Sequence, residues 1–153
     1  MPSRLHHLAL MVEDLGPALR LFRDLLGLEL AWHMPEVGGA RLAELLGAPG
    51  FRAEMAYLEQ PGGGVALELV RPLGPGAPGP TAQFGAAGSV SLSLMVADLD
   101  GLHQRLAEAG WPPLSPPLAM RAPGGQPLRA FCLLPLPGLC LELMEPADPG
   151  GGR

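Results

Sequence analysis

The chain has 153 residues, of which 48% are hydrophobic, and a formal net charge of −5 at pH 7. This length fits one compact domain of roughly 100 to 200 residues with a real core. The acidic balance and the absence of an arginine cluster argue against a nucleic-acid partner. Strand-length apolar runs, no basic-then-apolar leader and only two cysteines predict a soluble cytoplasmic protein without membrane spans or a disulfide framework.

The first third of the chain predicts a strand, a helix and a second strand. Residues 5–12 alternate two classes of side chain, as a strand does. Asp14 stands at an N-cap position, and apolar residues follow at helical spacing up to a terminating glycine. Residues 28–33 form the next predicted strand. The insert 35–50 contains a predicted short helix at residues 41–46.

A hairpin ends this first module, and the same order of elements then returns. Residues 52–59 and 65–70 flank a Gln-Pro-Gly-Gly-Gly sequence, which predicts two strands joined by a hairpin turn. Residues 89–96 predict a strand, and Asp98 caps a helix that a glycine ends. The proline-rich segment 111–121 predicts only an edge or irregular strand.

The return of the same pattern indicates an internal duplication. Residues 49–72 align without a gap with residues 123–146, and HHLALMVEDL aligns with VSLSLMVADL. Because each half alone would be marginally stable, we predict a single domain. Its parts are module 1 at about residues 3–72, a linker at 73–88, module 2 at about 89–146 and a flexible tail at 147–153.

The strand alternation assigns side chains to faces. In the first module, leucines occupy one face of each strand and must pack on the helix, so His7 and Glu68 point the other way. The second module places Ser91, Ser93, Cys140 and Glu142 on the corresponding face. The pattern predicts a polar cleft between the modules, with an imidazole and two carboxylates on its wall.

These residues resemble the vicinal oxygen chelate superfamily, which includes glyoxalase I, methylmalonyl-CoA epimerase, extradiol dioxygenases, and bleomycin and fosfomycin resistance proteins. The shared features are a βαβββ unit used twice, a His in the first strand before an Asp-Leu helix start, and a Glu-Leu pair in the fourth strand. The resemblance covers nearly the whole chain. It implies an α+β fold of two tandem βαβββ modules forming a curved eight-stranded sheet around a cleft, a small-molecule substrate or ligand, and a homodimer.

The resemblance also implies a metal site. In metal-dependent members, four positions surround a divalent ion, and here they correspond to His7, Glu68, Ser91 and Glu142. Ser91 stands where a His is usual, which argues against the iron site of an extradiol dioxygenase. One nitrogen and two carboxylates remain, a set that suits Mn, Ni, Co, Mg or Zn. A site without metal, because of Ser91, is the alternative.

With a metal, the expected chemistry is proton abstraction next to the carbonyl of a small carbonyl or thioester substrate, through an enediolate. Glu142 is then both ligand and candidate base. Glu54 is a second candidate base if the first hairpin is symmetric about Gly62, because Ala56 would then lie opposite Glu68 and Glu54 would share its face. This reading describes a glyoxalase-like isomerase, lyase or epimerase.

A different class of function fits the same residues. A metal-free binding protein of the bleomycin-resistance kind would sequester an apolar or cationic compound in the cleft. Cys132 and Cys140 are predicted to lie opposite each other, as small buried apolar residues in preference to a soft-metal or redox pair. His33 is expected on an outer strand and His103 on a solvated helix face.

Overall fold

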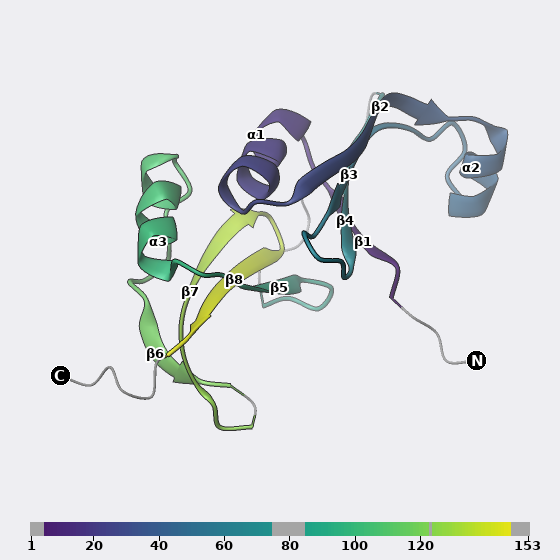
Figure 1. Cartoon of the computed structure of the whole chain (residues 1–153). Helices are drawn as coiled ribbons and strands as arrows, with labels where there is room; N and C mark the ends of the chain where they lie inside the picture. The colour runs from purple at the N-terminus through teal and green to yellow at the C-terminus, as the bar shows by residue number, and fades with distance from the viewer. Residues whose placement is uncertain (1–4, 75–84, 123, 148–153) are drawn as a thin grey trace. The chain divides into compact units, whose positions relative to one another are not determined.

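The computed structural model describes residues 5–74, 85–122 and 124–147. Residue contacts divide the chain into two units, Met1–Ala77 and Pro78–Arg153. Each unit holds one four-stranded mixed sheet (Figure 1), so the predicted α+β class and the eight predicted strands are confirmed. The central part of the predicted linker, 75–84, and nearly all of the predicted tail, 148–153, lie outside the described residues.

Unit 1 has the strand order β1-β4-β3-β2, in which β1 runs parallel to β4 and the other pairs are antiparallel. Its elements are β1 (His7–Met11), α1 (Leu15–Leu19), a π-helix η1 (Arg20–Leu25), β2 (Glu29–Gly38), α2 (Ala40–Leu46), β3 (Arg52–Glu59) and β4 (Ala66–Pro72).

The first helix begins where the sequence predicts. The Asp14 carboxylate accepts a hydrogen bond from the backbone N–H of Gly16 at 2.8 Å. After one turn, α1 continues as a π-helix, whose wider turn changes which side chains face inward. Leu21 and Phe22 are buried, whereas Leu19 is only half-buried, although it is one of the apolar residues at helical spacing after Asp14.

The insert differs in part from the prediction. The short helix is present as α2, and none of its residues is buried. In Figure 1 it stands beyond the end of β2, away from the sheet of its unit. However, β2 continues to Gly38 and does not stop at residue 33. Pro35 is tolerated within it because β2 is an edge strand and its pairing with β3 is irregular between Met34 and Val37.

Unit 2 repeats the arrangement with the strand order β5-β8-β7-β6. Asp98 caps its helix by accepting from the backbone N–H of Gly101 at 3.0 Å. The proline-rich segment yields only a four-residue edge strand, as predicted. The elements are β5 (Val90–Met95), α3 (Leu99–Glu108), β6 (Leu118–Arg121), β7 (Pro127–Leu136) and β8 (Leu139–Pro146).

The predicted faces are confirmed in both units. The leucines of β4 and β8 are buried, with Leu69 and Leu143 both 0% exposed. On the opposite faces, the equivalent methionines Met11 and Met95 are 60% and 58% exposed. One face of each sheet therefore packs on its helix, while the other, called here the open face, carries His7 and Glu68 in unit 1 and Ser91 and Glu142 in unit 2.

The predicted hairpin registers are wrong in both units. Tyr57, and not Ala56, lies opposite Glu68, because the connection from Gln60 to Val65 has its midpoint between Gly62 and Gly63. A shift of one residue exchanges the faces, so Glu54 lies on the face opposite to Glu68. The basis for Glu54 as a second base is thereby removed.

In unit 2, Cys132 lies opposite Glu142 and not opposite Cys140. The hairpin closes later than assumed, at Pro137 and Gly138, and β7 has an irregularity between Leu133 and Leu136. Cys132 and Cys140 are therefore diagonal neighbours on the open face.

His103 also differs from its prediction. It lies on α3 but is half-buried, with its ring edge-on to Phe131 at a centroid distance of 4.9 Å. Its Nε2 atom is 3.1 Å from the carbonyl oxygen of Ser115. It is a packed residue because the segment after α3 folds back over it.

Candidate functional site

The open face of unit 1 brings two of the predicted metal ligands together. The His7 Nε2 atom lies 3.6 Å from the Glu68 Oε2 atom. The carboxylate is largely sheltered, with 13% of its side chain exposed, whereas the imidazole is 38% exposed. His7 pairs with Ala66 in the parallel ladder, two residues before Glu68, so the imidazole reaches its partner along a diagonal of the sheet.

Neighbouring rings hold His7 in place. Its Nδ1 atom is 2.8 Å from the Nδ1 atom of His6, and its ring stands edge-on to Tyr57 at 5.9 Å. Tyr57 in turn stacks on Trp32, with 5.0 Å between centroids and 10° between planes. When His7 donates from Nδ1 to His6, its Nε2 is a lone-pair donor that faces Glu68, the tautomer that a metal ligand needs.

The donor pair fits a divalent ion in part. Two ligands of a tetrahedral ion with bonds of about 2.1 Å lie roughly 3.4 Å apart, close to the separation of His7 and Glu68. Among residues 5–74, 85–122 and 124–147, however, no group of three His, Cys, Asp or Glu side chains is placed to hold an ion. Unit 1 thus offers two ligands, and further ligands must be water or groups from elsewhere.

The open face of unit 2 surrounds Glu142 differently. Ser93, the direct cross-strand neighbour of Glu142, donates a hydrogen bond from Oγ to Oε2 at 2.6 Å. Ser91 is instead the direct cross-strand neighbour of Cys140, which lies two residues before Glu142 in β8. The hydroxyl that contacts Glu142 therefore belongs to Ser93, which the sequence placed on this face without a role. Only the pairing of β5 with β8, which the sequence does not fix, distinguishes the two serines.

The two cysteines adjoin Glu142. Cys140 is buried, and Cys132 is partly exposed. Burial, followed by the neighbouring Cys140 and the Glu142 carboxylate, raises the pKa of the Cys132 thiol to about 11. The Cys132 thiol is therefore neutral near pH 7, in agreement with its interpretation as a small apolar residue.

Glu54 belongs to an ion-pair network that is separate from His7 and Glu68. Its two oxygens lie 2.8 Å from His33 Nε2 and 2.8 Å from Arg71 Nε. The His33 hydrogen bond, followed by the Arg71 guanidinium, lowers the pKa of Glu54 against the opposing effect of burial. Glu54 thus joins β2, β3 and β4 across the other face of the sheet, and His33 lies on the outer strand as predicted.

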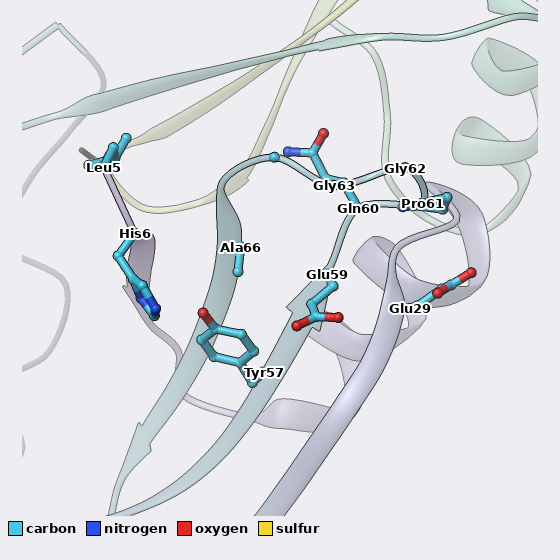
Figure 2. A pocket seen from close by; sticks show the side chains of 11 residues that line it. Leu5, His6, Glu29, Tyr57, Glu59, Gln60, Pro61, Gly62, Gly63 and Ala66 are labelled. Carbon is cyan, nitrogen blue, oxygen red and sulfur yellow. The ribbon is translucent and has the colours of Figure 1, made fainter.

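A hollow of about 770 Å³ lies next to the His7–Glu68 pair, within unit 1. Figure 2 shows His6, Tyr57 and Glu59 beneath the glycine-rich hairpin. Leu5, Glu29 and Ala66 complete the wall, together with residues 60–64 of the hairpin. The aromatic residues Trp32 and Tyr57 were not predicted as site residues, and their cross-strand stacking is a consequence of the register that the sequence left open.

Comparison with protein-family models identifies one family. The family model for the Glyoxalase/Bleomycin resistance protein/Dioxygenase superfamily matches residues 6–127. No curated protein matches the sequence significantly. A glyoxalase family protein from Bacillus cereus is similar in structure, with a TM-score of 0.80, 24% identity and 97% of each chain covered.

Two further solved structures share the fold. A glyoxylase/bleomycin resistance protein/dioxygenase domain from Frankia sp. has 25% identity, a TM-score of 0.62 and coverage of 97% of this chain and 96% of its own. A fosfomycin resistance protein from Listeria monocytogenes has 14% identity, a TM-score of 0.59 and 96% of each chain covered. In the described residues, no helix is both long and apolar enough to cross a membrane.

Proposed function

We propose, because the chain belongs to the Glyoxalase/Bleomycin resistance protein/Dioxygenase superfamily, that it is a metal-dependent isomerase, epimerase or lyase. Its substrate would be a small carbonyl or thioester compound from which a proton is removed next to the carbonyl. The observation that supports this most directly is the facing pair of His7 Nε2 and Glu68 Oε2 at 3.6 Å. We include in the proposal a cytoplasmic location and a homodimer, both expected from the sequence and its family resemblance.

His7 and Glu68 would hold the divalent ion, with Glu142 as a further ligand or as the base. The ion, when bound, supplies a Lewis acid that polarises the substrate carbonyl. Oε2 of Glu142 is occupied by the Ser93 hydroxyl. Its other oxygen is available to take a proton, and the Ser93 hydrogen bond orients the carboxylate for that transfer.

The test is solvent deuterium exchange into hemithioacetal and 2-oxo thioester candidates, with added Mn or Ni. We expect exchange with wild-type protein and a rate about 10² to 10⁴ lower in Glu142→Gln, the usual effect of losing a positioned acid or base. Glu44→Gln on the exposed helix α2 is the matched control and should leave the rate unchanged.

One observation favours a metal-free binding protein as the second candidate. The described residues provide no third ligand beside His7 and Glu68, while the same face carries the stacked Trp32–Tyr57 pair. Such a surface suits an aromatic or apolar compound. Absence of exchange with every candidate substrate, together with unchanged binding of aromatic ligands by Glu142→Gln, would replace the enzyme proposal with this one.

A further inference from the structure

We infer that the hollow under the β3–β4 hairpin binds the non-reacting end of the substrate and selects an end that carries a protonated amine. This inference rests on the proposed function and specifies its substrate class. The hollow lies within unit 1 and has a volume of about 770 Å³, which is within the range of small-molecule sites.

Tyr57 connects the hollow to the proposed reaction site. It lines the hollow, lies opposite Glu68 in the β3–β4 ladder and stands edge-on to His7 at 5.9 Å. Ala66, another lining residue, is the direct partner of His7 in the β1–β4 ladder. A substrate with its carbonyl at His7 and Glu68 can therefore extend past the Tyr57 ring into the hollow.

The charges that line the hollow favour a cation. Glu29 and Glu59 are direct partners in the β2–β3 ladder and both line the hollow, whereas no arginine does. Like charges placed directly opposite each other are unfavourable unless something between them compensates. The ion pairs in the described part of unit 1 involve other acidic residues, so none of them compensates the charge of Glu29 or Glu59. A phosphate-rich or carboxylate-rich end would be repelled by the two glutamates.

The neutral groups of the hollow suit an ammonium group as well. Tyr57, stacked on Trp32, offers an aromatic face for a cation. Gly62 and Gly63 have positive φ angles of 87° and 89°, and no atom beyond their chain neighbours lies within 4 Å of the position a Cβ would take. Their backbone carbonyls can therefore be approached closely by a donor, because no side chain shields them.

The binding preference can be measured without catalysis. We would titrate isotope-labelled protein, free of added metal, with n-butylamine, n-butanol and butyrate, and follow the amide signals of Gly62, Gly63 and Gly64 by NMR. We expect saturable shifts at these residues with butylamine, weaker binding of butanol and the weakest binding of butyrate. The preference should diminish at high salt, because the glutamates are exposed.

The Glu29→Gln/Glu59→Gln double variant should bind butylamine about tenfold more weakly and butanol equally well. Glu44→Gln is the matched charge control and should behave as wild type. Should the double variant fail to fold, Glu59→Gln alone gives the same test with a smaller change. Butyrate binding as tightly as butylamine, or amine shifts that are unaffected by the variants, would overturn the inference.

The outcome is separable from that of the proposed function. Amine binding at the hairpin without deuterium exchange would leave the hollow as an amine site and remove the enzyme. Exchange into a substrate with a neutral or anionic end, without amine binding, would keep the enzyme and remove the selectivity.

Discussion

The open faces of the two units carry a glutamate at the same place in the fourth strand, yet its surroundings differ. Glu68 faces the imidazole of His7 at 3.6 Å, and its direct neighbour in β1 is Ala9, whose side chain cannot form a hydrogen bond. Glu142 has the Ser93 hydroxyl as its direct neighbour, with an oxygen-to-oxygen distance of 2.6 Å, and Ser91 at the place of His7.

The comparison teaches that the neighbours across the strands decide what a carboxylate can do. Under the proposed function, the nitrogen donor beside Glu68 would make a metal-binding pair, whereas the hydroxyl beside Glu142 would hold an orientation suited to accepting a proton. The two glutamates occupy equivalent places, and two differences in the neighbouring strand, Ser91 for His7 and Ser93 for Ala9, give them different surroundings. The variants below test where the units are alike and where they differ.

The largest expected effect concerns what the units share. Leu69 and Leu143 occupy equivalent places in β4 and β8, and both are 0% exposed. Replacing either with Ala should lower the free energy of unfolding by about 2 to 5 kcal/mol, since each change leaves a cavity. Urea denaturation followed by circular dichroism measures the loss. Leu134→Ala, at a site that is 47% exposed, is the control and should cost much less.

The same experiment tests the prediction of a single domain. If both modules fold as one domain, each variant shifts one common transition. Two separate transitions, with each variant shifting only its own, would show that the units unfold independently.

The sequence predicted the elements because their signals are local. Asp14 and Asp98 mark the starts of α1 and α3, and alternation along β1, β4, β5 and β8 assigns the open faces correctly. These signals depend on neighbouring residues in the chain and on which side chains avoid water.

Register depends on the details of turns and could not be predicted. In the first hairpin, the midpoint lies half a residue later than predicted, and this difference moves Glu54 to the opposite face of the sheet. In the second hairpin, the turn comes later than predicted, so Glu142 and not Cys140 lies opposite Cys132. The Ser93–Glu142 bond and the Trp32–Tyr57 stack both follow from pairings of strands distant in sequence. Whether His7, Glu68 and Glu142 converge in one cavity remains a prediction.

A substitution at Ser91 should reduce the difference between the units. Ser91→His would place an imidazole relative to Glu142 as His7 lies relative to Glu68, because both positions pair two residues before the glutamate. We expect affinity for Ni or Zn to rise by about tenfold or more. Isothermal titration calorimetry measures the change, with Ala97→His as a control that adds an imidazole in an exposed loop. Equal affinities of wild type and Ser91→His would argue that residue 91 is not at a metal site.

Removing the Ser93 hydroxyl should have a smaller effect. Ser93→Ala leaves Glu142 without its hydrogen-bond donor and should lower the exchange rate roughly two- to tenfold, as expected for one lost hydrogen bond. Ala9→Ser is the reciprocal variant, which offers Glu68 a hydroxyl and should weaken metal binding without supplying a base. An unchanged rate in Ser93→Ala would mean that the hydrogen bond does not position Glu142 for catalysis.

The smallest expected effect is a loss of stability at alkaline pH that originates in unit 2. Cys132 takes the place opposite Glu142 that Tyr57 takes opposite Glu68, and burial raises its pKa from 9.0 to about 11. Because the folded state holds this proton more tightly than the unfolded state, its contribution to stability is complete below pH 9 and is lost as the pH rises through 11. Wild-type protein should therefore lose more stability between pH 9 and pH 11 than Cys132→Ala does, as measured by urea midpoints across that range. Parallel losses in the two proteins would mean that the Cys132 thiol ionises as easily in the folded chain as in the unfolded one.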